Sequence, residues 1–148
     1  MADFTFITTR LATGAAISSP DDVQQLIAAG VTHVVDCRAE FDDGQLLASS
    51  GLSYLWNGTQ DDGVHPKPPD WFGRSLAFAL PAICVTGAKV YAHCAAGVNR
   101  GPSTAYAIMR ALGWAAAPAE AQIRAARPQV GLAYAADADA AIEALGYA

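Results

Sequence analysis

The sequence of 148 residues is short of lysine, cysteine and long hydrophobic runs, and each shortage excludes a class of protein. Lys67 and Lys89 are its only lysines, and the net charge is −5, so we expect neither a broad nucleic-acid surface nor an anionic-membrane surface. The three cysteines are odd in number and lack metal-ligand spacing, which argues against a disulfide framework and a metal site.

Membrane and secretory signals are also missing from the sequence. The most apolar stretch, residues 76–85, is interrupted by Pro81 and is too short to cross a bilayer. The first four residues lack the basic and apolar segments of a signal peptide. With 53% hydrophobic and 16% charged residues, we expect one soluble, cytoplasmic globular domain spanning residues 1–148.

The pattern along the chain alternates between strands and helices. Ser19 and Pro20 are typical of a helix start, and Gly30 of its end. The alternation predicts an α/β fold with a mixed, mainly parallel sheet of four or five strands and helices on both sides. Strands are predicted at residues 4–7, 31–37, 52–56 and 90–93, a turn at 11–14, a polar segment at 38–51, a loop at 57–69, and later helices from about 70, 102, 118 and 137.

The most informative stretch is residues 90–103, VYAHCAAGVNRGPS. A short apolar strand leads into a tight loop that begins at Cys94 and ends at Arg100. Pro102 suits the first turn of the helix that follows. The stretch therefore predicts a loop wrapped over a helix N-terminus.

That geometry suits phosphate chemistry. Backbone N–H groups at a helix N-terminus bind anions, and a cysteine held there ionises more readily. The planar guanidinium of Arg100 offers two parallel donors to a phosphoryl group. A nucleophile inside a phosphate cradle is an arrangement for covalent phosphoryl transfer.

The stretch resembles the HCxxGxxR signature of cysteine-dependent protein phosphatases. His93 and Cys94, the internal Gly97 and the closing Arg100 match it, and the chain's size resembles the small dual-specificity branch. The resemblance implies that Cys94 is the nucleophile, that Arg100 binds phosphate and the transition state, and that His93 braces the loop. It also implies that the loop amides cradle the phosphoryl oxygens: Ala95, Ala96, Gly97, Val98, Asn99 and Arg100.

A general acid must protonate the leaving oxygen. In the family this is an aspartate on a loop roughly thirty residues before the cysteine. Asp61 and Asp62 both lie at that distance. We choose Asp62, because the following Gly63 lets the loop bend toward the site, and we keep Asp61 as the alternative and His65 as a less favoured one.

One position departs from the family pattern. A serine or threonine usually follows the arginine, and its hydroxyl helps the sulfur leave when the phosphoenzyme is hydrolysed. Here that position is Gly101, and Ser103 is the nearest hydroxyl that follows. We therefore predict slower dephosphorylation than in relatives that carry the hydroxyl.

The other two cysteines are expected in the core. Cys37 ends a predicted buried strand, and the alternative role for it is a resolving thiol that pairs with oxidised Cys94. Cys84 falls late in a predicted helix and is interpreted as a core residue.

These observations predict a phosphomonoester hydrolase that needs no metal or cofactor and works as a monomer. The expected substrates are phosphotyrosine and phosphoserine/threonine proteins or small phosphomonoesters. Asn99 before Arg100 also resembles RNA 5′-phosphatases, whereas the acidic chain disfavours RNA. The remaining alternatives are a catalytically weak phosphate-binding module and, less well matched, a rhodanese-type sulfurtransferase.

Overall fold

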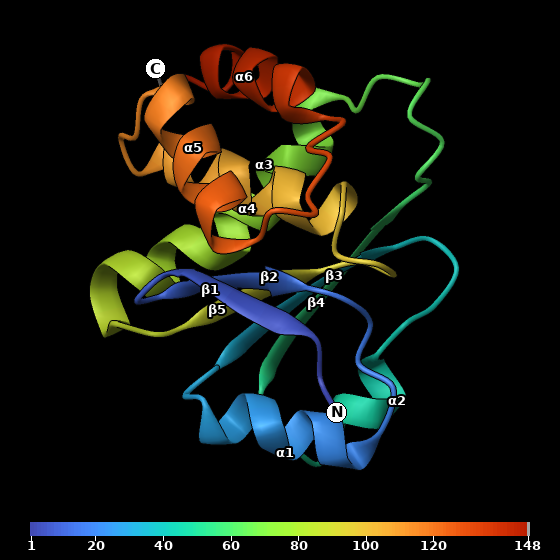
Figure 1. The fold of residues 1–148 in the computed structure, drawn as a ribbon. Helices are drawn as coiled ribbons and strands as arrows, with labels where there is room; N and C mark the ends of the chain where they lie inside the picture. Colours follow the sequence, from blue (N-terminus) through green and yellow to red (C-terminus); the bar gives the residue numbers. More distant parts are fainter. Residues whose placement is uncertain (148) are drawn as a thin grey trace.

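Five strands form the centre of the protein in the computed structural model, which describes residues 1–147 (Figure 1). They lie in the order β1-β2-β5-β3-β4, with β1 antiparallel to β2 and the other pairs parallel. The predicted mixed, mainly parallel sheet is confirmed, with β5 at its centre; Ala148, the last residue of the expected domain, lies outside the described residues. The strands are β1 (Phe4–Thr8), β2 (Leu11–Gly14), β3 (His33–Arg38), β4 (Ser53–Thr59) and β5 (Val90–His93).

Helices cover both faces of this sheet (Figure 1). The helices α1 and α2 lie against one face, and α3, α4, α5 and α6 lie against the other. Their bounds are α1 (Pro20–Ala28), α2 (Gly44–Leu47), α3 (Pro69–Pro81), α4 (Arg100–Ala111), α5 (Ala116–Ala126) and α6 (Ala135–Ala144), and a π-helical turn, η1 (Ala82–Thr86), follows α3.

Each face of the sheet buries its own hydrophobic cluster. Val35 packs in the larger cluster together with Leu76 and Ile108, and Val34 packs in the smaller one together with Leu26. Neighbouring residues of a strand point to opposite faces, so β3 contributes to both clusters. This is why the adjacent residues Val34 and Val35 in the middle of β3 are both apolar and both buried.

Local signals place the first helix as predicted. The Ser19 side chain accepts a hydrogen bond from the Asp22 N–H at 3.3 Å, and Pro20 occupies the first turn. Gly30 ends the segment with a φ of 91°, a conformation that costs glycine little. The polar segment 38–51 contains the short helix α2.

Two sequence interpretations are wrong. Residues 11–14, expected as a turn, form β2, because all four are buried and pair with β1 on one side and β5 on the other. Cys84, expected in the core, is exposed, whereas its neighbour Ile83 is buried. The π-helical turn after Pro81 changes the helical repeat, so the apolar pattern of α3 does not carry on to Cys84.

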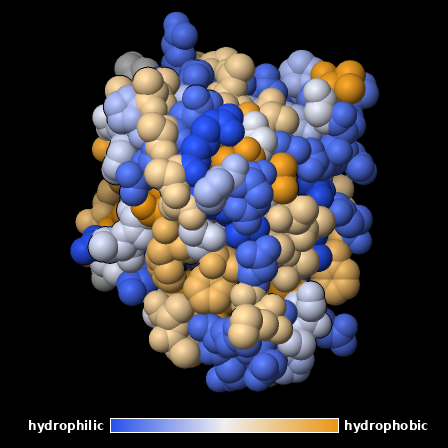
Figure 2. Space-filling model, viewed as in Figure 1, coloured by the Kyte–Doolittle hydropathy of each residue, from blue (hydrophilic) through white to orange (hydrophobic). Residues whose placement is uncertain are grey.

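The surface in Figure 2 mixes hydrophilic and weakly hydrophobic residues, and the strongly hydrophobic ones form small separate patches. Across residues 1–147, none of the helices combines the length and the apolar character that crossing a bilayer requires.

Candidate active site

The cysteine loop, residues 94–100, connects the end of β5 to the start of α4. Cys94 at its base is 1% exposed. Gly97 in its middle has a φ of 69° and lies against β2: a Cβ there would approach the Gly14 carbonyl carbon to 2.6 Å and Arg127 Nη2 to 2.5 Å. The loop therefore requires glycine at this position for both its conformation and its close packing.

The carbonyl groups of the cysteine loop are bound by segments outside it. The Ala16 N–H donates to Ala95 O at 3.1 Å, and the N–H groups of Gly131 and Leu132 donate to Val98 O at 2.8 and 3.2 Å. Arg127, which is 1% exposed, donates to Ala96 O at 3.2 Å and to Gly97 O at 2.9 Å. The loop is thus fixed from two sides through its oxygens.

After Cys94, the N–H groups of the same loop, unlike its carbonyl groups, have no hydrogen-bond partner in the described segments outside it. Within residues 1–147, the amides of residues 95–99 donate no hydrogen bond to the protein. Unpaired backbone amides at the start of a helix are donors that suit the binding of an anion. That the amides from Ala95 to Arg100 cradle phosphoryl oxygens stays a prediction.

Arg100 at the end of the loop is 3% exposed and is held firmly. Its two terminal nitrogens donate to the Glu40 carboxylate at 2.7 and 3.0 Å, and Nη1 also donates to Thr59 O at 2.9 Å. Its Nε is buried and has no partner in the described part of the chain. A buried donor without a partner is costly, so Nε is the atom of Arg100 that an anion bound at the cysteine loop would satisfy.

Glu40 is the site residue that sequence reasoning missed. It follows β3 by two residues, in a segment that was described only as polar. Hydrogen bonding from Arg100 lowers the pKa of Glu40 to about 2, so the carboxylate is ionised at neutral pH. The signal available in the sequence is its position: the carboxyl ends of the parallel strands β3 and β5 meet at one edge of the sheet.

Asp61 points to the cysteine loop. Its Oδ1 accepts hydrogen bonds from the Tyr134 hydroxyl at 2.9 Å and from Asn99 Nδ2 at 3.4 Å. Burial lowers the pKa of Arg100, but its hydrogen bond to Glu40 and the negative charges nearby, that of Asp61 among them, raise it above its usual value. The Tyr134 hydroxyl further accepts from the Gly63 N–H at 2.9 Å, which ties this loop to the start of α6.

Asp62 points into its own loop instead. Its carboxylate accepts from the N–H groups of Val64 and His65 at 3.0 and 3.1 Å and contacts His65 Nδ1 at 2.5 Å. These hydrogen bonds lower the pKa of Asp62, the bond from Val64 most of all. The structure therefore brings Asp61 to the cysteine loop and does not bring Asp62 or His65 there.

Gly101 is confined by the end of β5. A Cβ at this position would lie 2.9 Å from the carbonyl carbon of His93 and 3.0 Å from Ala92 O, so α4 begins too close to the strand for a side chain. The Ser103 hydroxyl accepts from the Tyr134 N–H at 3.3 Å. In the part of the chain that the structure describes, no hydroxyl group hydrogen-bonds to Cys94 Sγ.

Cys37 lies beneath the site, fully buried, and its Sγ is 3.4 Å from Thr104 Oγ1. Burial raises the pKa of this thiol far above its usual range. A protonated thiol is a poor nucleophile, so the structure favours the core role of Cys37 over the role of a resolving thiol.

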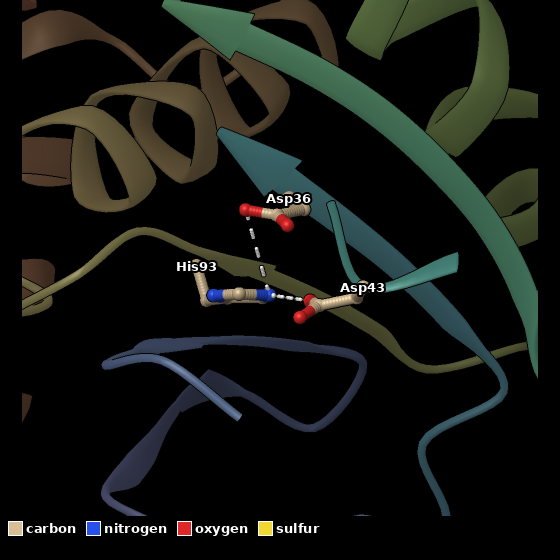
Figure 3. Close-up of side chains that lie close together, drawn as sticks. All are labelled: Asp36, Asp43 and His93. Atoms are coloured by element: carbon tan, nitrogen blue, oxygen red, sulfur yellow. Dashed lines mark hydrogen bonds and ion pairs between the residues drawn. The ribbon is translucent and has the colours of Figure 1, made fainter. Parts of the chain in front are cut away.

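His93 anchors the loop from behind, in a buried cluster with Asp36 and Asp43 (Figure 3). One potential ligand atom from each residue lies within 4.8 Å of the others, so among the described residues this is the group whose spacing could hold a metal ion. However, Arg38 donates to both carboxylates at 2.8 to 3.3 Å. The cluster already contains a cation and is closed to solvent, so it fits a metal ion poorly.

The comparisons with known proteins concern the fold. No family model matches this sequence, and neither does any curated protein. The crystal structure of PTPMT1 in complex with PI(5)P superimposes with a TM-score of 0.79 at 17% identity, covering 96% of this chain and 98% of that one. The structure of human DUSP28 superimposes with a TM-score of 0.79 at 21% identity, covering 99% of this chain and 98% of that one. The human tyrosine phosphatase-like serine/threonine/tyrosine-interacting protein gives 0.77 at 19% identity, covering 100% of both chains.

These three proteins superimpose on nearly the whole length of this chain at low sequence identity. The protein therefore has the fold of the cysteine-dependent protein tyrosine phosphatases, in the form of the small dual-specificity enzymes.

Proposed function

We propose that this protein is a phosphomonoesterase that works through a phosphocysteine on Cys94. One observation carries the proposal: five loop amides and the buried Nε of Arg100 are unpaired donors around a buried cysteine. Donors arranged in this way bind a phosphoryl group and stabilise the charge of its equatorial oxygens in the transition state.

The reaction has two steps. The Cys94 thiolate attacks phosphorus, the bond to the leaving oxygen breaks, and the general acid gives its proton to that oxygen. Water then attacks the phosphocysteine, the same carboxylate takes the proton from the water, and the thiolate leaves with its electron pair. Asp61 is the general acid in this mechanism, in place of Asp62, because its carboxylate is hydrogen-bonded to the side chain of Asn99 in the cysteine loop.

Glu40 gives Arg100 its orientation. The carboxylate holds both terminal nitrogens of Arg100, so the guanidinium plane is fixed before substrate binds. Preorganised donors cost no reorganisation in the transition state. Arg100 then contacts phosphate through Nε while Glu40 and Thr59 O keep the other end in place.

Phosphotyrosine proteins are the preferred substrate class, with phosphoserine/threonine proteins second. No lysine or arginine lies among loop residues 95–99, although basic residues there would suit a phosphoinositide or an RNA 5′ end. The PTPMT1 structure contains PI(5)P, so assays of substrate preference should include a phosphoinositide beside the phosphopeptides. An RNA 5′ end is the other alternative substrate to include.

We further propose that the protein is a monomer of the reducing cytoplasm, an environment that its three free cysteines fit.

A catalytically weak phosphate-binding module is the second candidate. Two observations favour it: Gly101 supplies no hydroxyl to the sulfur, and Glu40 already occupies the terminal nitrogens of Arg100. One protein of the same fold is named as a phosphatase-like interacting protein.

Stopped-flow hydrolysis of an aryl phosphate separates the two candidates. The wild-type protein is expected to show a rapid burst and a slower steady rate, and Cys94→Ser to show neither. If the wild type does not turn over aryl phosphate or phosphotyrosine peptides, yet Cys94→Ser binds such a peptide in calorimetry, the protein is a binding module.

A further inference from the structure

A cavity of about 590 Å³ lies beside the cysteine loop, on the face of the sheet that α1 and α2 cover (Figure 1). It is formed between the segment that leads from β2 into α1 and the segment that leads from β3 into α2. Its volume is within the range of ligand-binding clefts. None of the residues proposed for catalysis lines it, so the cavity is a separate feature at the same edge of the sheet.

The two walls of this cavity are tied to the cysteine loop. On one wall, Ala16 lines the cavity and its N–H donates to Ala95 O in the loop at 3.1 Å. On the other wall, Arg38 and Phe41 flank Glu40, whose carboxylate binds the arginine at the end of the loop. Three residues of an extended peptide span about 10 Å, so a peptide whose phosphotyrosine lies in the loop can place a nearby side chain in the cavity.

Apolar side chains supply most of the cavity walls: Ala16, Ile17, Pro20, Phe41 and Leu46. Phe41 is 50% exposed, so its ring is available to a ligand, and burying the ring on binding is favourable. The Arg38 guanidinium lies over the same ring, 4.7 Å from its centre, which helps to hold the ring in place. These walls suit the apolar body of a large side chain.

Arg38 supplies a hydrogen-bond donor to the cavity. The residue is 7% exposed, and its Nε and Nη2 donate to the buried carboxylates of Asp36 and Asp43. Its Nη1 has no hydrogen-bond partner among residues 1–147. A side chain that enters the cavity would shield Nη1 from water, so that side chain must offer an acceptor in return.

Asp42 supplies an acceptor to the same cavity. Its Oδ1 accepts from the Tyr54 hydroxyl at 2.6 Å and from the Gly44 N–H at 2.8 Å, while Oδ2 has no partner in the part of the chain that the structure describes. The hydrogen bond from Tyr54 holds the pKa of Asp42 below its usual value, so the carboxylate is ionised at neutral pH. A bound anion would face this carboxylate and a bound cation would face Arg38, so a neutral group that both accepts and donates fits the cavity best.

We propose that this cavity binds an unphosphorylated tyrosine side chain of a phosphotyrosine substrate, within three residues of the phosphotyrosine. The phenol ring packs against Ile17, Phe41 and Leu46. Its hydroxyl accepts from Arg38 Nη1 and donates to Asp42 Oδ2. The proposal rests on the proposed function, because it requires a phosphopeptide in the cysteine loop. The protein then selects its substrates by sequence as well as by the phosphoryl group.

The first test measures kcat/KM for a set of phosphotyrosine peptides. In a background of alanine and glycine, one tyrosine is placed in turn at each of the three positions before and the three positions after the phosphotyrosine. At one of these positions tyrosine is expected to raise kcat/KM about tenfold over alanine, and phenylalanine about threefold, because phenylalanine lacks the hydroxyl. Lysine or glutamate there should do no better than alanine. Equal values for all peptides, or a preference for phenylalanine, lysine or glutamate over tyrosine, would overturn the proposal.

Two variants test the apolar wall and the hydroxyl contact separately, each as a ratio between two peptides, which a general loss of activity does not change. Phe41→Ala should reduce the preference for tyrosine over alanine to about twofold, whereas Leu112→Ala, at the end of α4 on the other face of the sheet, should keep it. Asp42→Asn keeps Oδ1 and replaces Oδ2 by a donor, so tyrosine should lose its advantage over phenylalanine. Asp70→Asn, at the start of α3, should keep that advantage. An unchanged ratio in Phe41→Ala or in Asp42→Asn would contradict the proposed contacts.

Calorimetry with the Cys94→Ser protein separates this proposal from the proposed function. If this variant binds the tyrosine-bearing peptide about tenfold more tightly than the alanine peptide while the wild type hydrolyses neither, the cavity proposal stands and the phosphatase function fails. If the wild type hydrolyses both peptides at the same rate and Cys94→Ser binds both equally, the phosphatase function stands and the cavity proposal fails.

Discussion

The cysteine loop and the acid loop, residues 60–66, face each other across the site but are held in opposite ways. In the cysteine loop Cys94, Gly97 and Arg100 are buried, and its carbonyls are bound by three other segments. Every residue from 60 to 66 is exposed. The acid loop is placed by a few polar contacts, chiefly those of Asp61 with Tyr134 and Asn99.

This difference shows how one site combines two kinds of structure. The cysteine loop is built into the packing between β5, β2 and α4, so altering it should disturb the fold. The proposed acid is attached by side-chain hydrogen bonds, so altering it should change the reaction and leave stability nearly unchanged. The predictions below test that contrast.

Cys94→Ser is expected to have the largest effect, because it removes the proposed nucleophile. The steady rate of aryl phosphate hydrolysis should fall by about 10⁴-fold or more. Binding of a phosphotyrosine peptide, measured by calorimetry, should persist. Residual turnover within tenfold of wild type would contradict the phosphocysteine mechanism.

Asp61→Asn and Asp62→Asn form a matched pair, since both remove one carboxylate from the same loop. Asp61→Asn should lower kcat for a substrate with a poor leaving group by about 10²- to 10³-fold, because the leaving oxygen loses its proton donor. Asp62→Asn should lower it by less than about threefold. The reverse order would return the assignment to Asp62.

Gly101→Ser tests whether the close packing of the start of α4 against the end of β5 tolerates a side chain. The new Cβ would meet the His93 backbone, so we expect the free energy of unfolding to fall by about 1–3 kcal/mol and the activity to fall with it. Gly101→Ala is the control, because it adds the same Cβ without the hydroxyl. A serine variant with faster steady turnover than wild type would instead show that the missing hydroxyl limits dephosphorylation.

Glu40→Gln removes the charge that fixes Arg100 and should lower kcat/KM by about tenfold. The pKa of Glu40 lies at about 2, below its ordinary 4.5, so the pair stabilises the fold above the ordinary value and is lost as the pH falls toward 2. The difference in unfolding midpoint between wild type and Glu40→Gln should therefore be larger at pH 7 than at pH 3. An equal difference at both would contradict a charged pair.

Tyr134→Phe should have the smallest effect, because it removes one hydroxyl that donates to Asp61 and accepts from the Gly63 N–H. We expect kcat to fall by about threefold to tenfold with little change in unfolding midpoint. Tyr106→Phe is a suitable control, since its hydroxyl contacts Asp139 on α6. A wild-type rate for Tyr134→Phe would show that Asn99 alone places the acid.

The cysteine loop could be predicted from the sequence because the residues that specify it lie close together along the chain. A strand, a cysteine, a glycine, an arginine and a proline within 14 residues suffice to predict it. The turn assigned to residues 11–14 was wrong because those residues become a strand only by pairing with β5, which lies about eighty residues further along the chain. Cys84 was placed wrongly because a π-helical turn interrupts the repeat on which its burial was predicted.

The sequence by itself determined the type of sheet, the cysteine loop and the residues Cys94 and Arg100, since adjacent residues specify each of them. Only the tertiary structure decided that Glu40 orients Arg100, that Asp61 rather than Asp62 faces the loop, and that Asp43 contacts His93. The physical reason is that these contacts join the carboxyl ends of strands and loops that lie 38 to 60 residues apart along the chain. Their polar side chains acquire a partner only when the parallel sheet brings those ends to one edge.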